Sequence, residues 1–136
     1  MIFQLDYVTV ITIVLVSYLG VSLILFIAGT YIMQIYASSK KWDDSFKIPY
    51  KINTIWFVVS LAIGIPLSLL YGDNVMIDFV KFGANMLVGV IFAIRYYKKE
   101  KGDAIQFILV IQLILFIIGV IFSNVFSMLS ISILIN

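Results

Sequence analysis

Four long apolar stretches dominate this sequence and limit what the chain can fold into. They run over residues 7–36, 52–71, 75–97 and 104–135. Each reaches the ~20 residues that a helix needs to cross a hydrocarbon core. Lipid offers no hydrogen-bond partner to the backbone, so a segment that crosses it must satisfy its own N–H and C=O groups as a helix. The sequence therefore predicts an all-α integral membrane protein, an antiparallel bundle of four transmembrane helices forming a single domain over residues 1–136.

The composition agrees with a chain that is solvated by lipid. Hydrophobic residues make up 63% and charged residues 12% of the sequence, against ~45–50% and about 25% in soluble domains. The chain has no cysteine and no histidine, so it lacks thiolates, the commonest metal ligand and the commonest general base near neutral pH. We therefore expect no metal site, no cofactor and no enzymatic activity, with a membrane enzyme as the least favoured alternative.

Basic residues gather around two of the three connections between these stretches. They are Lys40, Lys41, Lys47, Lys51, Arg95, Lys98, Lys99 and Lys101. Short cytoplasmic loops carry an excess of lysine and arginine. We therefore expect residues 37–51 and 98–103 to face the cytoplasm from the cell membrane, with both termini outside. The same eight side chains are expected to contact anionic lipid headgroups.

The third apolar stretch contains two opposite charges, Asp78 and Lys81. If the helix began only after Lys81, its apolar span over residues 82–94 would measure about 20 Å, too short for a ~30 Å core. The helix must therefore begin near Val75 and carry both charges one to two turns into the membrane. Their i, i+3 spacing places them on one helix face, where they can pair.

Asn85 extends this charged face into a polar stripe on the third helix, and the stripe continues through Gly89 to Tyr96. A stripe of this kind does not face lipid. Two interpretations stay open: a helix–helix interface tied by an ion pair, or part of a path for an ion or a substrate. For the pair itself we predict a structural role, with Asn85 reaching a neighbouring helix. A matching stripe in the fourth stretch consists of Gln112, Gly119, Ser123, Ser127 and Ser130.

Small residues four positions apart predict where helices approach closely. Such pairs are Ser60 with Gly64, Gly89 with Ala93, and Gly119 with Ser123. We expect the third and fourth helices, which are joined by a short loop, to pack against each other through the last two pairs. The first and fourth stretches are longer than the hydrocarbon core requires, so they should tilt or project beyond it.

The sequence favours a non-enzymatic accessory or scaffold subunit of a membrane complex, because its polar groups suffice for helix packing and no catalytic set is present. The alternative is a small transporter or channel that uses the polar stripe on the third helix. We expect such a transporter to be oligomeric, because one four-helix bundle encloses little room. The expected partners are the lipid bilayer and other membrane subunits or copies of the chain itself, and no nucleic acid.

Overall fold

Helices account for nearly all of the described chain. The computed structural model describes residues 7–72 and 74–135, without the side chains of residues 130 and 133–135. Its helices are α1 (Tyr7–Ser39), α2 (Lys47–Tyr71), α3 (Val75–Tyr97) and α4 (Lys101–Ile135). These residues contain no strand, and all four helices are long and apolar enough to cross a membrane. The predicted all-α fold with four membrane-length helices is confirmed.

Three helices are longer than their apolar stretches. α1 continues to Ser39, α2 begins at Lys47 and α4 begins at Lys101, where the apolar pattern predicted boundaries at residues 36, 52 and 104. The apolar run marks the part of a helix that lies in lipid, whereas the helical hydrogen bonds continue into the polar residues beside it. In α2 the extension is anchored by Pro49, which is buried in the first turn, where its missing N–H removes no helical hydrogen bond.

The bounds of α3 match the sequence prediction, and local chemistry explains both. The side chain of Asn74 accepts a hydrogen bond from the backbone N–H of Met76 at 2.9 Å, which caps the N-terminus. Lys98 takes a left-handed conformation (φ 55°), and its N–H donates to the carbonyl of Ile94. α3 therefore begins at Val75, and Asp78 lies in its first turn, as the length argument required.

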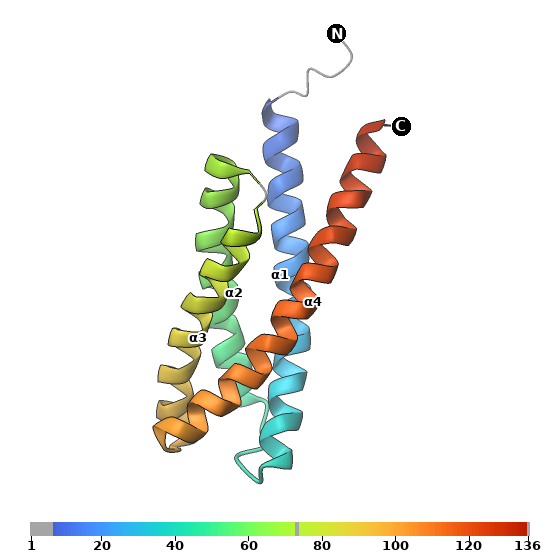
Figure 1. Cartoon of the computed structure of the whole chain (residues 1–136). Helices are drawn as coiled ribbons and strands as arrows, with labels where there is room; N and C mark the ends of the chain where they lie inside the picture. The colour runs from blue at the N-terminus through green and yellow to red at the C-terminus, as the bar shows by residue number, and fades with distance from the viewer. Residues whose placement is uncertain (1–6, 73, 136) are drawn as a thin grey trace.

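The four helices form a ring around a shared interior. α1 and α3 each pack against both α2 and α4, whereas in the described residues the backbone of α1 does not approach that of α3, nor the backbone of α2 that of α4. Figure 1 shows each helix returning in the direction opposite to the one before it, so both ends of the described chain lie at one end of the bundle. A side chain that points inward from any helix therefore faces the same central space.

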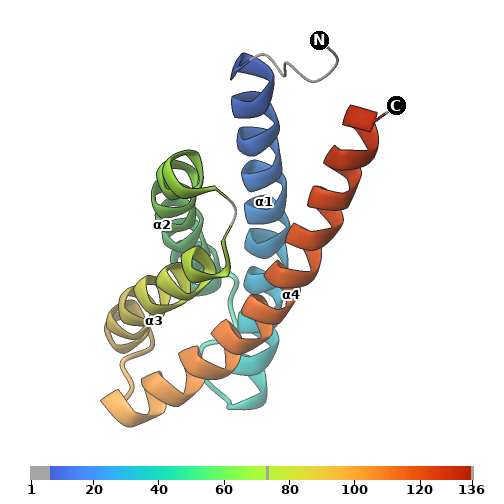
Figure 2. The ribbon, with the colours of Figure 1, turned by 45° about the horizontal axis from the view of Figure 1, so that its top comes forward.

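The lengths of the helices differ, and this opens one end of the ring. α1 and α4 have 33 and 35 residues, whereas α2 and α3 have 25 and 23. At 1.5 Å per residue the longer helices exceed the shorter ones by about 15 Å. Figure 2 shows α1 and α4 extending past the loop that joins α2 and α3. α1 and α4 therefore project beyond the two shorter helices, and their expected projection beyond the hydrocarbon core stays a prediction.

The opposite end of the bundle, which carries the two basic loops, is closed by an apolar core. The core contains Met33, Ala37, Ile48, Ile52, Trp56, Ala93, Tyr97, Ala104, Phe107, Ile108, Ile111 and Leu115. The first loop adds Trp42, whose ring lies 5.3 Å from that of Tyr97 and 4.7 Å from that of Phe107. Tyr36 lies 5.1 Å from the same Phe107 ring. We call Tyr36, Trp42, Tyr97 and Phe107 the aromatic seal.

Candidate functional site

The two charges of α3 form the ion pair that the sequence predicted. Lys81 Nζ lies 3.4 Å from Asp78 Oδ1, and the two side chains keep 17% and 26% of their surface accessible. The N-terminal end of a helix favours a carboxylate, so the position of Asp78 in the first turn adds to the stabilisation by Lys81. Lys81 Nζ also lies 5.0 Å from the centre of the Tyr18 ring of α1, close enough for a cation–π contact.

Asn85 reaches a neighbouring helix, as predicted. Its Nδ2 donates to Ser60 Oγ of α2 at 3.1 Å, and its backbone carbonyl accepts from Trp56 Nε1 at 2.9 Å. The other amide atom, Oδ1, is buried and has no hydrogen-bond partner among the described residues. An orphaned buried acceptor is costly, because it has lost its bond to water without gaining another.

A central cavity of about 70 Å³ lies between the four helices. Its polar lining consists of Ser22, Asn53, Ser60, Asp78, Lys81, Asn85, Gln112 and Ser123. A water molecule needs roughly 10–15 Å³ of such space, so the cavity has room for a few waters or a small molecule. Gln112, another of these residues, is only 4% exposed.

A wider open chamber adjoins the central cavity on the side of the chain termini. It holds about 700 Å³, and Val10, Phe126 and Gly72 are among the residues that line it. The cavity and the chamber share Asp78 and Lys81. The ion pair therefore lies where the two spaces meet. We expected one four-helix bundle to enclose little room, and the central cavity of about 70 Å³ agrees with that expectation. The larger space is open, and the long helices α1 and α4 extend its walls beyond α2 and α3.

Sequence reasoning found part of this lining and missed the rest. The stripe predicted on the fourth helix does face the interior: Gln112 and Gly119 border the cavity, and Ser127 borders the chamber. The side chain of Ser130 lies outside the described residues. Ser22 and Asn53 also line the cavity. Ser22 stands alone in an apolar stretch and Asn53 lies beside Thr54 at the start of another, so only the packing of α1 and α2 shows that they face inward.

The small residues pack closely, but not all between the predicted partners. A Cβ at Gly89 would lie 2.6 Å from Trp56 of α2 and 2.9 Å from Ile108 of α4, and Ala93 is fully buried. A Cβ at Gly64 would meet Tyr18 of α1.

We expected Gly119 and Ser123 to pack α4 against α3, but these two residues lie elsewhere. A Cβ at Gly119 would meet Leu25 of α1 at 3.4 Å, and Ser123 borders the cavity and the chamber. α4 tilts across the bundle (Figure 2), so its outer half leaves α3 and faces α1.

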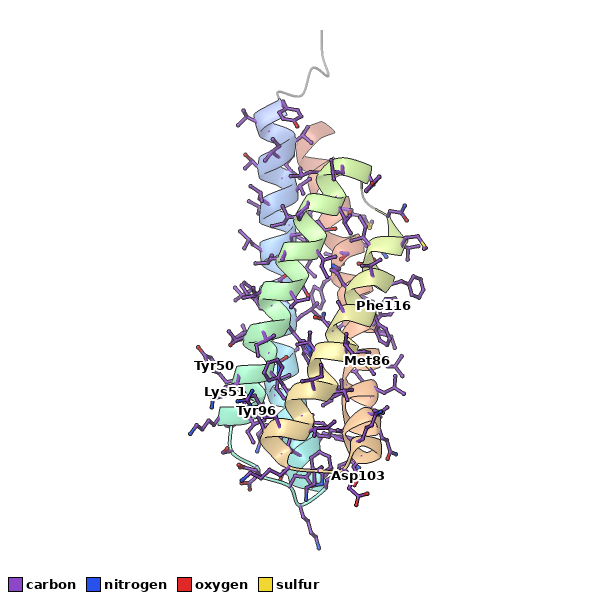
Figure 3. All side chains as sticks on the ribbon, turned by 90° about the vertical axis from the view of Figure 1, so that its left-hand side faces the viewer. Tyr50, Lys51, Met86, Tyr96, Asp103 and Phe116 are labelled. Atoms are coloured by element: carbon purple, nitrogen blue, oxygen red, sulfur yellow. The ribbon has the colours of Figure 1, made fainter. Side chains whose placement is uncertain are left out.

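The eight basic residues of the two groups lie at the closed end of the bundle. Three of them contact aromatic rings: Lys40 lies over Tyr36 and Trp42, Lys99 over Trp42, and Lys51 over Tyr96. Figure 3 shows Lys51 and Tyr96 close together near this end. Lys41, Lys47, Arg95, Lys98 and Lys101 are exposed, as contact with lipid headgroups would require, and that contact stays a prediction.

The site is lined with charged, hydroxyl and amide groups, and a cluster of metal-ligating side chains is absent from its described residues. No group of three or more His, Cys, Asp or Glu side chains that could hold a metal ion occurs in residues 7–72 and 74–135. What the arrangement offers is one positive and one negative group at the mouth of a small cavity lined with hydroxyls and amides. No family model, no curated protein and no solved structure matches the sequence.

Proposed function

We propose that the protein is a small membrane transporter that admits a small polar solute through the open chamber and binds it at Asp78, Lys81 and Asn85. The observation that supports this most is the asymmetry of the bundle's interior. At one end a polar cavity opens into a wide chamber, and at the other an apolar core and the aromatic seal close it. Polar groups that serve only helix packing are expected to lie enclosed between helices and not beside an open space.

The orientation of this path is part of the proposal. Both basic loops lie at the closed end (Figure 1), so the positive-inside rule places the closed end at the cytoplasm and the open chamber at the outer surface of the cell membrane. The protein then faces outward, and release of a solute into the cell requires the aromatic seal to open. Because one chain already encloses the cavity, transport in this proposal needs no second copy to complete the site.

A second candidate, the non-enzymatic accessory subunit favoured by the sequence, has its own support. Lys81 pairs with Asp78, and Asn85 bonds Ser60, so these polar groups also hold α3 in place. Polar contacts of this kind act as glue between membrane helices. In that case the cavity would be a consequence of helix tilt, and the protein would function by contacting other membrane subunits.

The test is uptake from a mixed pool by proteoliposomes that contain only this protein. The pool holds equal concentrations of small neutral, zwitterionic, anionic and cationic solutes, and mass spectrometry measures which of them enter. We expect selective entry of at least one solute with the natural sequence and with Gly83→Ala, a control on an open face of α3. The double variant Asp78→Asn with Lys81→Met should lose that entry.

If no solute enters faster than through protein-free vesicles, the transport proposal is wrong. Purification from native membranes then tests the second candidate, because an accessory subunit should come with a fixed set of partner proteins in constant ratio.

A further inference from the structure

We infer that the ligand of the central cavity is a small zwitterion, with its anionic group on Lys81 and its cationic group on Asp78. This inference deepens the proposed function and rests on the same site. It starts from the charge of the lining. Asp78 and Lys81 are the only charged residues that line either the cavity or the open chamber among the described residues. The binding site therefore has one charge of each sign and no net charge.

Net neutrality restricts the ligand, because the site lies between apolar helices. A ligand with a single charge would satisfy one member of the pair and leave the other facing a like charge or nothing. Charges removed from water in this way are costly unless each has a partner. A zwitterion supplies both partners at once and keeps the filled cavity neutral, whereas an uncharged ligand would leave the existing pair as it stands.

The ion pair has capacity for a second set of partners. Its N–O distance of 3.4 Å is longer than the ~2.7–2.9 Å of a strong charged hydrogen bond. An ammonium has three donors and a carboxylate accepts at two oxygens. The contact between Lys81 and Asp78, together with the Tyr18 ring beside Lys81, therefore leaves hydrogen-bonding capacity on both charged groups. Both side chains remain partly accessible from the cavity and the chamber.

The neutral amide side chains that line the cavity beyond the ion pair favour a ligand with hydrogen-bond donors. Asn85 lines the cavity, and its Oδ1 is buried and has no hydrogen-bond partner among the described residues. Gln112, on the facing helix α4, lines the same cavity and is only 4% exposed. The ammonium group of a zwitterion has three N–H donors, enough to serve Asp78 and an amide oxygen together.

The test measures binding of matched isosteres to the purified protein in nanodiscs of an anionic lipid, phosphatidylglycerol. β-Alanine is the zwitterion, butyrate replaces its ammonium by a methyl group, and 3-methylbutylamine replaces its carboxylate by an isopropyl group. We expect β-alanine to bind at least about tenfold tighter than either isostere, because each isostere leaves one charge of the pair without a new partner.

Variants that remove one charge of the pair should change which ligand the site prefers. Lys81→Met leaves a negative site, which should prefer 3-methylbutylamine, and Asp78→Asn leaves a positive site, which should prefer butyrate. In the double variant the site carries no charge, so β-alanine, butyrate and 3-methylbutylamine should bind with similar affinity. This variant keeps the test valid if a single variant does not fold. Gly83→Ala, whose added methyl group meets no atom within 4 Å, should bind β-alanine like the natural sequence.

The zwitterion can be a free solute or a lipid headgroup, and a second nanodisc separates them. If phosphatidylethanolamine in the bilayer weakens β-alanine binding, a headgroup occupies the site; if it has no effect, the site takes a free solute, and both results support zwitterion recognition. Equal affinity for the three isosteres, no binding of β-alanine, or unchanged preference in the charge variants overturns it. Selective uptake of a singly charged solute from the mixed pool would overturn this inference alone, whereas zwitterion binding without uptake would overturn only transport.

Discussion

At the scale of single residues, the Asp78–Lys81 pair makes a prediction about stability that does not depend on any ligand. Asp78→Asn or Lys81→Met leaves one charge partly buried without its partner, so each single variant should unfold at a lower temperature in detergent. Removing both charges avoids that cost, and the double variant should regain part of the loss. The coupling energy from the double-mutant cycle should fall in the range of about 0.5–3 kcal/mol.

The cycle has a built-in comparison at Asn85, which bonds Ser60 and not the ion pair. Asn85→Ala combined with Ser60→Ala should show its own coupling, because the bond between them spans α3 and α2. A coupling of zero between Asp78 and Lys81 would mean that the two side chains do not interact, and Lys81 would then extend toward the outer headgroups instead.

At the scale of helices, Gly89 of α3 lies directly against side chains of both α2 and α4. Gly89→Ala places a methyl group 2.6 Å from Trp56 and 2.9 Å from Ile108, so these side chains or the helices that carry them must shift. Overpacking of this kind costs about 1–3 kcal/mol. We expect a lower melting temperature in detergent, measured by the loss of the near-ultraviolet circular dichroism of the packed aromatic residues.

Gly119→Ala is the matched control for this prediction. It adds the same methyl group in the same kind of helix, but the nearest atom, on Leu25, lies 3.4 Å away in ordinary van der Waals contact. Its melting temperature should stay close to that of the natural sequence. If Gly119→Ala destabilised the protein as much as Gly89→Ala, the outer half of α4 would have to pack more tightly than it does here.

At the scale of the whole molecule, the direction of the bundle in the membrane decides which side can reach the chamber. The natural chain has no cysteine, so single cysteines report without background. Ser38→Cys reports on the closed end and Tyr71→Cys on the open end. Tyr71 is used instead of the nearby Asn74, because the Asn74 side chain caps α3. In intact cells a membrane-impermeant maleimide should label Tyr71→Cys and should label Ser38→Cys only after the membrane is opened.

The two labelling results test different statements. Labelling of both positions from outside would contradict the four-helix topology, since α2 would not cross the membrane between them. Labelling with the sides exchanged would keep the fold and reverse the orientation, and the open chamber would then face the cytoplasm.

The sequence by itself determined the parts of this protein that depend on the solvent and on neighbours along the chain. Four apolar stretches predicted four helices because lipid cannot satisfy the backbone. The length of the third stretch placed Asp78 and Lys81 inside a helix, and their i, i+3 spacing predicted the pair that the structure contains. These inferences need only helix geometry and the thickness of the membrane, and both are local properties of the sequence.

Only the tertiary structure decided what those residues face. Tyr18, Ser22 and Asn53 carry no periodic signal, and they reach the site because α1 and α2 turn them toward the ring's interior. Gly119 was assigned to the wrong neighbour because small-residue spacing predicts close packing without naming the partner. The open chamber depends on the tilt of α4 as well as on the unequal helix lengths, and packing among all four helices decides that tilt, so no single stretch of sequence encodes the chamber.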